Sequence, residues 1–342
     1  MRSRKRSGSN HRNHRSKPQP RRTVSSHGSC DEAVRESRDR IAAALQYSGF
    51  KFPVADITIN MAPADLRKEG SSFDLPLAIG ILGANSNIIE DHLKEYMMVG
   101  ELSLDGTLQP IRGALPIAIR ARAEHFKGLI VPEQNVREAA VVNNLEVYGM
   151  KNLLEVIQFM NDQSNPSPTI VDTRKEFYEN QSHFDLDYAD VRGQENVKRA
   201  LEVAAAGGHN LIMVGPPGSG KSMMAKRLPS ILPPLTLSES LETTQIHSIA
   251  GKLGKNVSLI SQRPFRSPHH TISQVALVGG GATPQPGEIS LHTMACSSAT
   301  SCPSSTRRPS RCCASLWKTG TSTSAAPNTP STILVLSCLW QA

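Results

Sequence analysis

The chain has 342 residues, enough for two domains, and its 38 Lys and Arg against 30 Asp and Glu give a formal net charge of +8. It has no run of 18 apolar residues and no apolar stretch in its first 30 residues, so neither a membrane-spanning helix nor a secretory signal is expected. Six cysteines without a C-x-x-C pair give neither a zinc motif nor a disulfide framework, and we expect a cytoplasmic protein.

The first 30 residues are rich in Arg, Ser, His and Asn and have no hydrophobic period. This composition is typical of a disordered segment. Its basic run is either a solvated tail or a segment that holds nucleic acid through phosphate contacts. We therefore predict a disordered basic tail at 1–30.

Residues 31–161 alternate predicted helices and strands. In Asp31–Tyr47 the apolar residues fall on one helical face, and Gly49 is placed to end that helix. This alternation predicts a compact α/β or α+β domain. Further along, the pattern predicts strands at 55–61, 96–104, 128–131 and 145–148, a turn at Asp105-Gly106, and helices at 75–82, 114–125, 135–142 and 152–160.

A polar, proline-bearing stretch at 162–183 predicts a linker to a second unit, which begins at 184. Within that unit we expect a helix at 195–206, a strand at 210–214 and a helix that runs to about Leu228. A further helix is predicted at 238–249, with Ser238 as its N-cap. It is followed by a basic loop at 263–270 and a flexible turn at 278–281.

The stretch between the strand at 210–214 and the next helix fits the phosphate-binding pattern G-x-x-x-x-G-K-[ST]. In this position backbone N–H groups and the helix dipole attract phosphate. Lys221 is expected to reach the β- and γ-phosphates of ATP, and the Ser222 hydroxyl is expected to bind Mg²⁺. The predicted site consists of Gly215, Pro216, Pro217, Gly218, Ser219, Gly220, Lys221 and Ser222.

Several strings, taken in order, point to one family. On these strings residues 31–291 resemble the ComM/YifB subfamily of the magnesium-chelatase family of AAA+ ATPases. The strings are AVRESRDR (33–40), APADLRKEGSSFDLPLAIGIL (62–82), GELSLDGTLQPIRGALP (100–116), GQENVKRALEVAAAGGHNLIMVGPPGSGKS (193–222), RPFRSPHHTIS (263–273), ALVGGG (276–281) and PGEISL (286–291).

The resemblance implies an α/β fold class, with a ribosomal-S5-like α+β domain over 31–161, related to that of Lon-type proteases. An incomplete AAA+ P-loop core follows over 184–291. Relatives of this core use ATP and Mg²⁺ and form rings, commonly hexamers. ComM proteins act as ATP-driven DNA helicases in branch migration during natural transformation. A magnesium-chelatase-type motor with a porphyrin partner is an alternative.

The relation to Lon raises a second hypothesis, a serine protease with Ser72 as its nucleophile. That chemistry needs a lysine to take the hydroxyl proton. The chain has Leu115 where the resemblance places the lysine. Ser72 is therefore interpreted as a structural residue.

Two other groups of residues are candidates for contacts. The resemblance implies that Val191 and Gly193 contact the adenine end of ATP, and an ordinary helix start is the alternative. The basic loop offers either DNA contacts in a ring pore or ion pairs with a neighbouring subunit. The pattern leaves those two roles open for Arg263, Arg266, His269 and His270.

Residues 292–342 depart from the family pattern. An AAA+ ATPase needs an acidic pair that positions Mg²⁺ and water, and the family places it soon after P-G-E-I-S-L, in D-E-L-P-E-F. This stretch contains no Asp and no Glu. Codons ACG AGC TGC CCG AGT TC for Thr300-Ser-Cys-Pro-Ser-Ser305, read one base earlier after a G, give D-E-L-P-E-F. The same shift turns 294–298 into N-G-V-L-F and 311–319 into E-V-L-R-Q-P-L-E-D.

We therefore hypothesise a single-base change near codons 291–293, with residues 292–342 as a disordered, out-of-frame tail. The loss of central strands is expected to leave the apolar strand at 211–214 partly uncovered. Without the acidic pair we expect negligible ATP hydrolysis. A non-enzymatic fragment, in which only the N-terminal domain folds and binds partners, is the remaining alternative.

Overall fold

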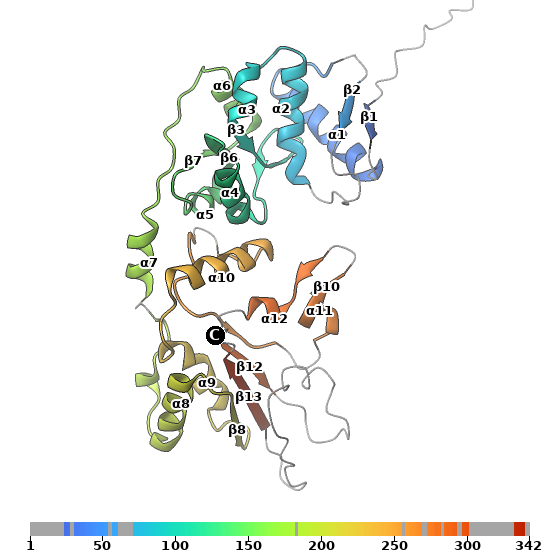
Figure 1. Cartoon of the computed structure of the whole chain (residues 1–342). Helices are drawn as coiled ribbons and strands as arrows, with labels where there is room; N and C mark the ends of the chain where they lie inside the picture. Colours follow the sequence, from blue (N-terminus) through green and yellow to red (C-terminus); the bar gives the residue numbers. More distant parts are fainter. Residues whose placement is uncertain are drawn as a thin grey trace, which may run out of the picture.

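The computed structural model of the chain describes residues 24–27, 31–53, 57–60, 71–181, 184–254, 257–268, 272–281, 284–292, 296–300 and 332–338. Two groups of elements lie at opposite ends of the molecule (Figure 1). We call residues 31–161 together with the strand at 24–27 the first unit, and residues 184–292 together with the strands at 296–300 and 332–338 the second unit. Within the described ranges, no helix is both long and apolar enough to cross a membrane.

The first unit mixes helices with short strands, as the sequence predicted. The predicted helix at 31–47 is confirmed with the same bounds. The elements of this part are β1 (Val24–His27), α1 (Asp31–Tyr47), β2 (Ile57–Asn60), η1 (Ser71–Phe73), α2 (Asp74–Ala84), α3 (Glu90–Glu95), β3 (Tyr96–Met98), β4 (Glu101–Leu102), β5 (Leu108–Gln109), α4 (Ala114–Ala123), β6 (Gly128–Pro132), η2 (Glu133–Asn135), α5 (Val136–Ala139), β7 (Glu146–Met150) and α6 (Leu153–Met160).

A parallel sheet in the order β3-β6-β7 forms the centre of the first unit. Met98 pairs with Ile130, which also pairs with Tyr148 of β7. Successive side chains of a strand point to opposite faces. Accordingly, Ile130 joins one core cluster, while Leu129 and Val131 join another. Both faces of β6 are therefore buried, as is usual for parallel strands covered by helices.

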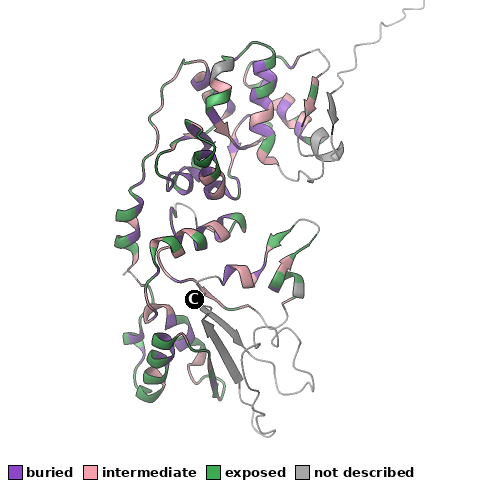
Figure 2. Ribbon diagram, in the orientation of Figure 1, coloured by how far each residue is buried: buried purple, intermediate pink, exposed green. Residues whose placement is uncertain are grey.

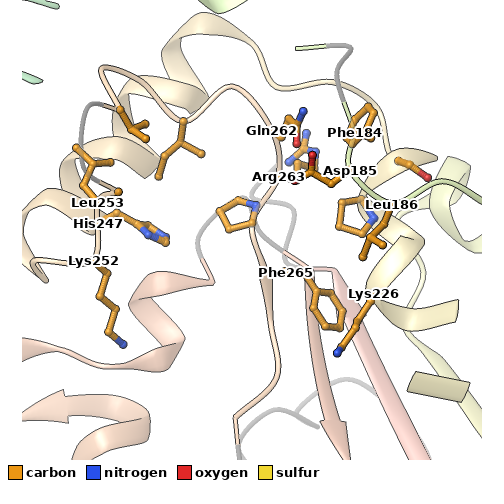
Figure 3. A pocket seen from close by; sticks show the side chains of 16 residues that line it. Phe184, Asp185, Leu186, Lys226, His247, Lys252, Leu253, Gln262, Arg263 and Phe265 are labelled. Carbon is orange, nitrogen blue, oxygen red and sulfur yellow. The ribbon is translucent and has the colours of Figure 1, made fainter. Parts of the chain in front are cut away.

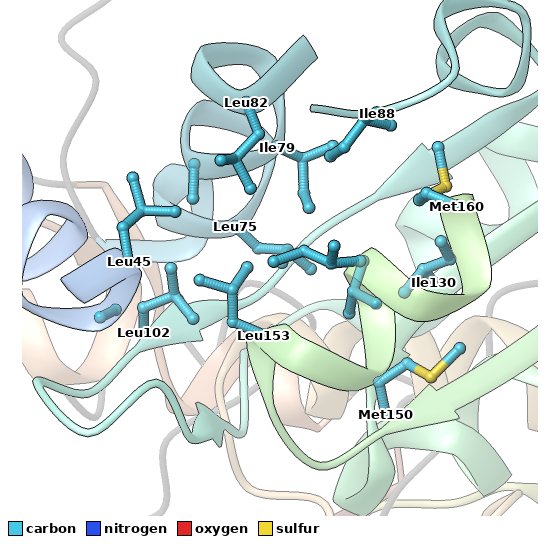
Figure 4. Close-up of a cluster of buried hydrophobic side chains, with 14 of the residues drawn as sticks. Leu45, Leu75, Ile79, Leu82, Ile88, Leu102, Ile130, Met150, Leu153 and Met160 are labelled. Atoms are coloured by element: carbon cyan, nitrogen blue, oxygen red, sulfur yellow. The ribbon is translucent and has the colours of Figure 1, made fainter. Parts of the chain in front are cut away.

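Helices α1, α2 and α6 supply the core on one face of this sheet (Figure 4). Leu45 and Leu153 are fully buried there. The aromatic rings of Tyr96, Tyr148 and Phe159 lie with their centroids 4.7 to 5.9 Å apart. Helices α4 and α5 contribute to the cluster on the other face. The first unit thus has a core on each side of its sheet.

The predicted strand at 96–104 is divided into β3 and β4 at Gly100. The Gly100 N–H donates to the Ser72 carbonyl over 3.0 Å, and the Gly100 carbonyl accepts from Leu75 N–H over 3.1 Å. A Cβ at Gly100 would lie 2.9 Å from a methyl group of Leu108. A side chain of α2, Leu75, also lies 3.3 Å from that position, so Gly100 is in close contact with α2 at the point where the strand is interrupted.

The predicted linker at 162–183 contains a helix, α7 (Thr173–Gln181). Phe177 is buried in the same core cluster as α4, together with Val171. The side-chain amide of Gln181 donates to the carbonyl of Leu235 in the second unit, over 2.8 Å. Most other side chains of α7 are polar and exposed, so composition alone indicated a linker. The connection is instead a packed segment that contacts both units.

The second unit begins with the 3-10 turn η3 and is built around the P-loop strand. The predicted strand at 210–214 and the helix at 195–206 are confirmed within one residue at each end. Its elements are η3 (Tyr188–Asp190), α8 (Glu195–Gly207), β8 (Leu211–Gly215), α9 (Lys221–Arg227), η4 (Leu228–Ser230), α10 (Leu237–Ile249), β9 (Phe265–Arg266), α11 (Gln274–Val278), β10 (Gly279–Gly280), β11 (Gln285–Pro286), α12 (Glu288–Leu291), β12 (Cys296–Thr300) and β13 (Thr332–Cys338).

The prediction that 1–30 and 292–342 are disordered throughout is wrong for three short segments. Strand β1 pairs in parallel with β2. Strands β12 and β13 pair with each other, and β13 also pairs with β8, in a sheet of order β8-β13-β12-β9. The sequence signal for β13 is its apolar run at 333–336, which can pair with another strand wherever a free edge is available.

Two local predictions in the second unit also need correction. The N-cap of α10 is Thr236 rather than Ser238, because Thr236 and Glu239 form a reciprocal capping box. The predicted flexible turn at 278–281 includes β10, which pairs with β11 as a short antiparallel ribbon. Positive φ at Gly279 and Gly280 makes this backbone path accessible to glycine.

Candidate nucleotide-binding site

The P-loop connects the end of β8 to the first turn of α9. Its glycines have the conformations that the loop requires, since Gly218 and Gly220 have φ of +80° and +85°. A Cβ added at Gly215 would lie 3.1 Å from the Ser219 hydroxyl, inside the space that the loop encloses. The loop thus provides a concave backbone surface at a helix N-terminus, which is an anion-binding arrangement.

Lys221 lies inside the loop and points back across it. Its Nζ donates to the carbonyls of Gly215 and Pro216 over 2.9 and 2.8 Å and to the Ser219 hydroxyl over 3.0 Å. All three acceptors are uncharged, so no carboxylate neutralises the ammonium through these bonds. The cation is therefore held where a phosphate could replace the three oxygens as its partner. Ser222, the residue expected to bind Mg²⁺, follows at the exposed start of α9.

A cleft with a volume of ≈ 460 Å³ lies beside the P-loop. Strand β8 and helix α8 form its walls, and Gly215, Ser219 and Lys221 border it. Pockets of this size hold small molecules and cofactors. Helix α8 and the residue before it contribute five lining residues to this cleft, which are Gln194, Asn196, Val197, Ala200 and Leu201.

The two residues predicted to contact the adenine end of ATP differ in their position relative to this cleft. Val191 is buried in the core cluster of the second unit and is not among the residues that line the cleft. Gly193 has φ of +70° and turns the chain toward Gln194, which does line it. The Gln194 side-chain amide donates to the Ser219 carbonyl over 3.4 Å. Sequence reasoning missed Gln194, although its position directly before a helix and after Gly193 was an available signal.

The cleft fits phosphate better than it fits a complete Mg²⁺ site. Among the residues that line it there is no Asp or Glu. In the described part of the chain, no group of three or more His, Cys, Asp or Glu residues is arranged to hold a metal ion. Ser222 can contribute one hydroxyl ligand, while phosphate oxygens and water would supply the others. The arrangement can bind a nucleotide phosphate, but these lining residues contain no group to polarise an attacking water.

The basic loop at 263–268 is tied into the second unit through its arginines. Arg263 is buried, and its Nε donates to the Pro233 carbonyl over 2.8 Å. Arg266 makes two hydrogen bonds to the Glu288 carboxylate, of 2.9 and 2.6 Å. Both residues therefore have partners within the chain. His269 and His270 lie outside the described residues, so contacts of this loop with DNA or another subunit stay a prediction.

Glu288 is the centre of a charge cluster that joins three segments. Lys252, just after α10, also donates to its carboxylate, over 2.9 Å. Burial alone raises the pKa of Glu288, but the hydrogen bonds from Arg266 and Lys252 outweigh it and lower the pKa to about 2. Burial lowers the pKa of the nearby His247 and His292 as well. These histidines are thus favoured as neutral side chains beside the ion pairs.

A second cavity, of ≈ 400 Å³, lies between the end of α9 and the segment at 257–265 (Figure 3). Phe184, Leu186 and Phe265 give it apolar walls, and Lys226 and Arg263 add positive charge. It shares no lining residue with the P-loop cleft. Because none of its lining residues belongs to the phosphate-binding pattern at 215–222, the P-loop cleft remains the candidate nucleotide site.

The protease hypothesis has no support in the geometry around Ser72. Ser72 belongs to the turn η1, and its carbonyl accepts the Gly100 N–H. Leu115 is fully buried at the start of α4. Its apolar side chain cannot take a proton from a hydroxyl. The interpretation of Ser72 as a structural residue is consistent with this backbone contact.

Comparison with family models matches two separate regions of the chain. Residues 14–135 match the model described as subunit ChlI of Mg-chelatase, and residues 187–296 match the model described as magnesium chelatase, subunit ChlI. The first match covers most of the first unit, and the second contains the P-loop and its cleft. The two matches together follow the order of the two units.

Comparison with individual proteins gives relatives that are similar over the same range. The chain is 46% identical over 264 residues to the competence protein ComM of Haemophilus influenzae, which covers 77% of the chain and 51% of that protein. It is 42% identical to YifB of Escherichia coli, over 76% of the chain and 50% of that protein. Lon protease 2 of Bacillus subtilis is 28% identical over 143 residues, which is 41% of the chain and 25% of the protease. The chain therefore spans about half the length of the ComM and YifB proteins that it matches.

Proposed function

The chain belongs to the ComM/YifB subfamily of the magnesium-chelatase family, and on this premise we propose that its second unit binds ATP with Mg²⁺ at the P-loop. The observation that carries the proposal is the P-loop itself. Gly218 and Gly220 adopt left-handed backbone conformations, and Lys221 lies inside the loop with uncharged partners. An AAA+ ATPase-like protein is what the family relationship supports.

In this proposal each P-loop residue has a separate task. The backbone N–H groups around Gly218 to Gly220 and the N-terminus of α9 hold the phosphates. Lys221 leaves its three oxygen acceptors and pairs with the β- and γ-phosphates, and Ser222 binds the metal ion. Bound Mg²⁺ would neutralise part of the phosphate charge. Gln194 and Val197 line the part of the cleft that borders α8, where the rest of the nucleotide would lie.

We further propose that this chain hydrolyses ATP very slowly. Hydrolysis in this class of site needs an acidic residue for Mg²⁺ and a carboxylate that polarises water. The cleft lining has neither, and residues 292–342 contain no Asp or Glu. Binding without turnover is the expected behaviour.

Nucleotide binding is tested by titration with a fluorescent ATP analogue in the presence of Mg²⁺. Lys221→Ala should weaken binding by at least about tenfold, since a charge-assisted contact to phosphate is lost. Lys226→Ala is the matched control, because Lys226 lies exposed on the same helix and does not line the P-loop cleft. Equal affinities for the wild type and Lys221→Ala would contradict the proposal. ATP turnover by the wild type that Lys221→Ala abolishes would refute slow hydrolysis alone.

The composition of 292–342 motivates a separate proposal, that this stretch is translated in a shifted reading frame. Strand β12 follows α12 closely, in the region where the alternate frame encodes N-G-V-L-F and then D-E-L-P-E-F. The DNA sequence of codons 285–300 tests the idea. A frame that is intact through codon 342, with no family-like continuation in the alternate frame, would exclude it.

For the intact family protein we propose an ATP-driven ring that remodels DNA, with the domain division at 31–161 and 184–291 retained. The ComM relationship supports this role. A DNA motor should bind branched DNA with a strong salt dependence, whereas a chelatase-type motor should require a second protein subunit and porphyrin. Binding that is insensitive to salt and to branching would argue against the DNA role.

One observation favours a non-enzymatic fragment as the second candidate. The first unit has a buried core on both faces of its sheet, while the P-loop strand exposes Ile212 and Val214. Limited proteolysis distinguishes the two functions. A protease-resistant product of about residues 31–161, whose length does not increase when nucleotide is added, would favour the non-enzymatic protein. Protection of residues 184–291 from cleavage by nucleotide would favour the ATP-binding protein.

A further inference from the structure

Helix α10 buries a polar stripe where a helix of its length usually buries an apolar one. Its buried residues recur at the spacing of one helical face. They carry hydroxyl or imidazole groups, although Leu237 and Leu241 pack against a core cluster nearby. Figure 1 shows this helix on the side of the second unit that faces the first, and Figure 2 shows in the same orientation that it carries both buried and exposed residues. The stripe consists of Ser240, Thr243, Thr244, His247 and Ser248.

Most members of this polar stripe bond to their own unit. The Ser240 hydroxyl donates to the Ile260 carbonyl over 2.5 Å, and the Thr244 hydroxyl accepts from Ile260 N–H over 3.0 Å. A ring nitrogen of His247 lies 3.4 Å from the Leu291 carbonyl oxygen. These bonds fix α10 to the P-loop unit and satisfy the buried groups, as buried polar atoms require.

Ser248 differs because two of its hydrogen-bond partners belong to the first unit, although its carbonyl also accepts from the Gly251 N–H of the second unit over 2.9 Å. Its hydroxyl donates to the Glu138 carboxylate of α5, and its carbonyl accepts from the Gly113 N–H over 3.2 Å. Gly113 is the N-cap residue of α4 and has φ of +78°. The C-terminal end of α10 therefore meets the N-terminal end of α4 through polar groups.

Glu138 is the group on the first unit that receives this contact. Its carboxylate is buried and also accepts from the Leu115 N–H over 3.0 Å and from the Asn135 side-chain amide over 3.2 Å. The amide of Asn135 in turn bonds to the backbone of Ile111 on both its donor and acceptor sides, at 2.9 Å each. Glu138 thus stabilises the positive end of α4, and Ser248 supplies one of its hydrogen bonds from the other unit.

A short packed segment connects this contact to the P-loop. Helix α9, which begins at Lys221, continues into η4, and Leu228 and Leu232 lie in the core of the second unit. Three residues later, Leu235 is buried in the cluster that contains Ala114 and Leu115 of the first unit. The Thr236–Glu239 capping box then fixes the start of α10. The segment between α9 and α10 is therefore held by packing in the cores of both units.

We propose that α10 transmits the nucleotide state of the P-loop to the first unit, and that the Ser248–Glu138 hydrogen bond is the contact through which α4 and α5 respond. The inference rests on the proposed binding of ATP to this P-loop. The apolar N-terminal end of α10 anchors this helix. Its polar C-terminal end can exchange hydrogen-bond partners without exposing apolar surface. Interfaces between domains that move are commonly more polar than a permanent core, and small sliding of packed helices is a known mode of such coupling.

Hydrogen–deuterium exchange of the full chain, with and without the ATP analogue and Mg²⁺, tests the proposal. Nucleotide should change the exchange of the segment 111–121 by at least about fivefold in the wild type, the lower range of allosteric couplings. Ser248→Ala should bind nucleotide but lose that change, while Ser248→Thr, which retains the hydroxyl, should keep it. Ser238→Ala is the control, because Ser238 is exposed on the same helix and its hydroxyl lies 3.2 Å from that of Thr236, within the second unit.

The outcomes separate this inference from the proposed function. If the analogue binds and 111–121 does not respond, or if Ser248→Ala responds like the wild type, α10 does not transmit the signal through this contact. If no nucleotide binds, the proposed function fails and the inference fails with it. Should Ser248→Ala prove unfolded by circular dichroism, Glu138→Gln serves in its place. It keeps a side-chain oxygen for Ser248 but removes the charge, so a weakened response supports the proposal and an unchanged one contradicts it.

Discussion

Strands β6 and β8 are each five residues long, but only β6 is buried along its whole length. Strand β6 lies between β3 and β7, whereas β8 pairs with β13 alone among the described strands. As a result, Leu129 and Ile130 of β6 are fully buried, while Ile212 and Val214 of β8 are 47% and 61% exposed. The uncovered strand at 211–214 that the sequence predicted is confirmed at these two residues.

The difference follows from where each strand finds its neighbours. Both partners of β6 come from the same unit, at 96–98 and 146–150. The partner of β8 comes from 332–336, far along the chain. Pairing between distant segments has a larger entropic cost than pairing between near ones. The first unit therefore has the more complete core, and the following changes test that difference.

The largest effect is expected from the buried ion pair of the first unit. Asp74 is fully buried at the start of α2, and Arg40 donates to it over 2.8 Å. This hydrogen bond raises the pKa of Arg40, although burial opposes the shift. Asp74→Asn should lower the free energy of unfolding by about 3 kcal/mol, because it leaves the part-buried Arg40 without its buried counter-charge. Urea unfolding measures the change.

The control for this pair is Glu36→Gln. Glu36 also bonds to Arg40, over 2.7 Å, but its side chain is 77% exposed. A solvent-exposed partner contributes only about 0.5 kcal/mol. Equal losses for Asp74→Asn and Glu36→Gln would show that burial does not set the strength of the Arg40 contacts.

The two strands themselves offer a matched pair of substitutions. Ile130→Ala should destabilise the chain by about 3 kcal/mol, since it removes a fully buried side chain and leaves a cavity. Ile212→Ala changes the same residue type in a strand and should cost less than about 1 kcal/mol, because water already reaches Ile212. Chemical unfolding of both variants compares them. A larger loss for Ile212→Ala would reverse the comparison between the units.

The charge cluster of the second unit should make the free energy of unfolding depend on acidic pH. Because the pKa of Glu288 is lowered from 4.5 to about 2, its carboxylate stabilises the folded chain fully above pH 4.5. This contribution is lost as the pH falls toward 2. We expect the Glu288 carboxylate to contribute about 2 kcal/mol to the free energy of unfolding, after allowing for water around the outer sides of Arg266 and Lys252. Glu288→Gln should remove this pH dependence in unfolding measured from pH 5 to pH 2, whereas the exposed Glu202→Gln should retain it.

The smallest effect concerns the start of α10. Thr236→Ala should lower the free energy of unfolding by about 1 kcal/mol, because its hydroxyl accepts the Glu239 N–H at the N-cap. Ser238→Ala, at the position that the sequence pattern indicated, should change the free energy of unfolding by less than about 0.5 kcal/mol. Thermal unfolding distinguishes the two. A larger loss for Ser238→Ala than for Thr236→Ala would indicate that Ser238 is the N-cap of α10.

The sequence was most informative where local chemistry alone decides the structure. The bounds of α1 were predicted from its apolar face, and the position of the P-loop from its glycines and Lys221. It was least informative about the cleft wall. Gln194 offered only its position after Gly193 and before a helix as a signal, and Asn196 carries no distinctive pattern, yet both line the cleft together with residues of β8. The polar stripe of α10 was likewise hidden, since its serines and threonines resemble the exposed face of a surface helix.

The sequence by itself determined the family, the position of the glycine-rich motif at 215–222 and the absence of acidic residues after Leu291. Each depends on residue identity at fixed spacing, which folding does not alter. Only the tertiary structure decided that α7 packs on both units, that Arg263 and Arg266 bond within the chain, and that Ser248 meets Glu138. Those outcomes depend on segments far apart in sequence, and their geometry is set by the packing of helices and sheets rather than by local propensity.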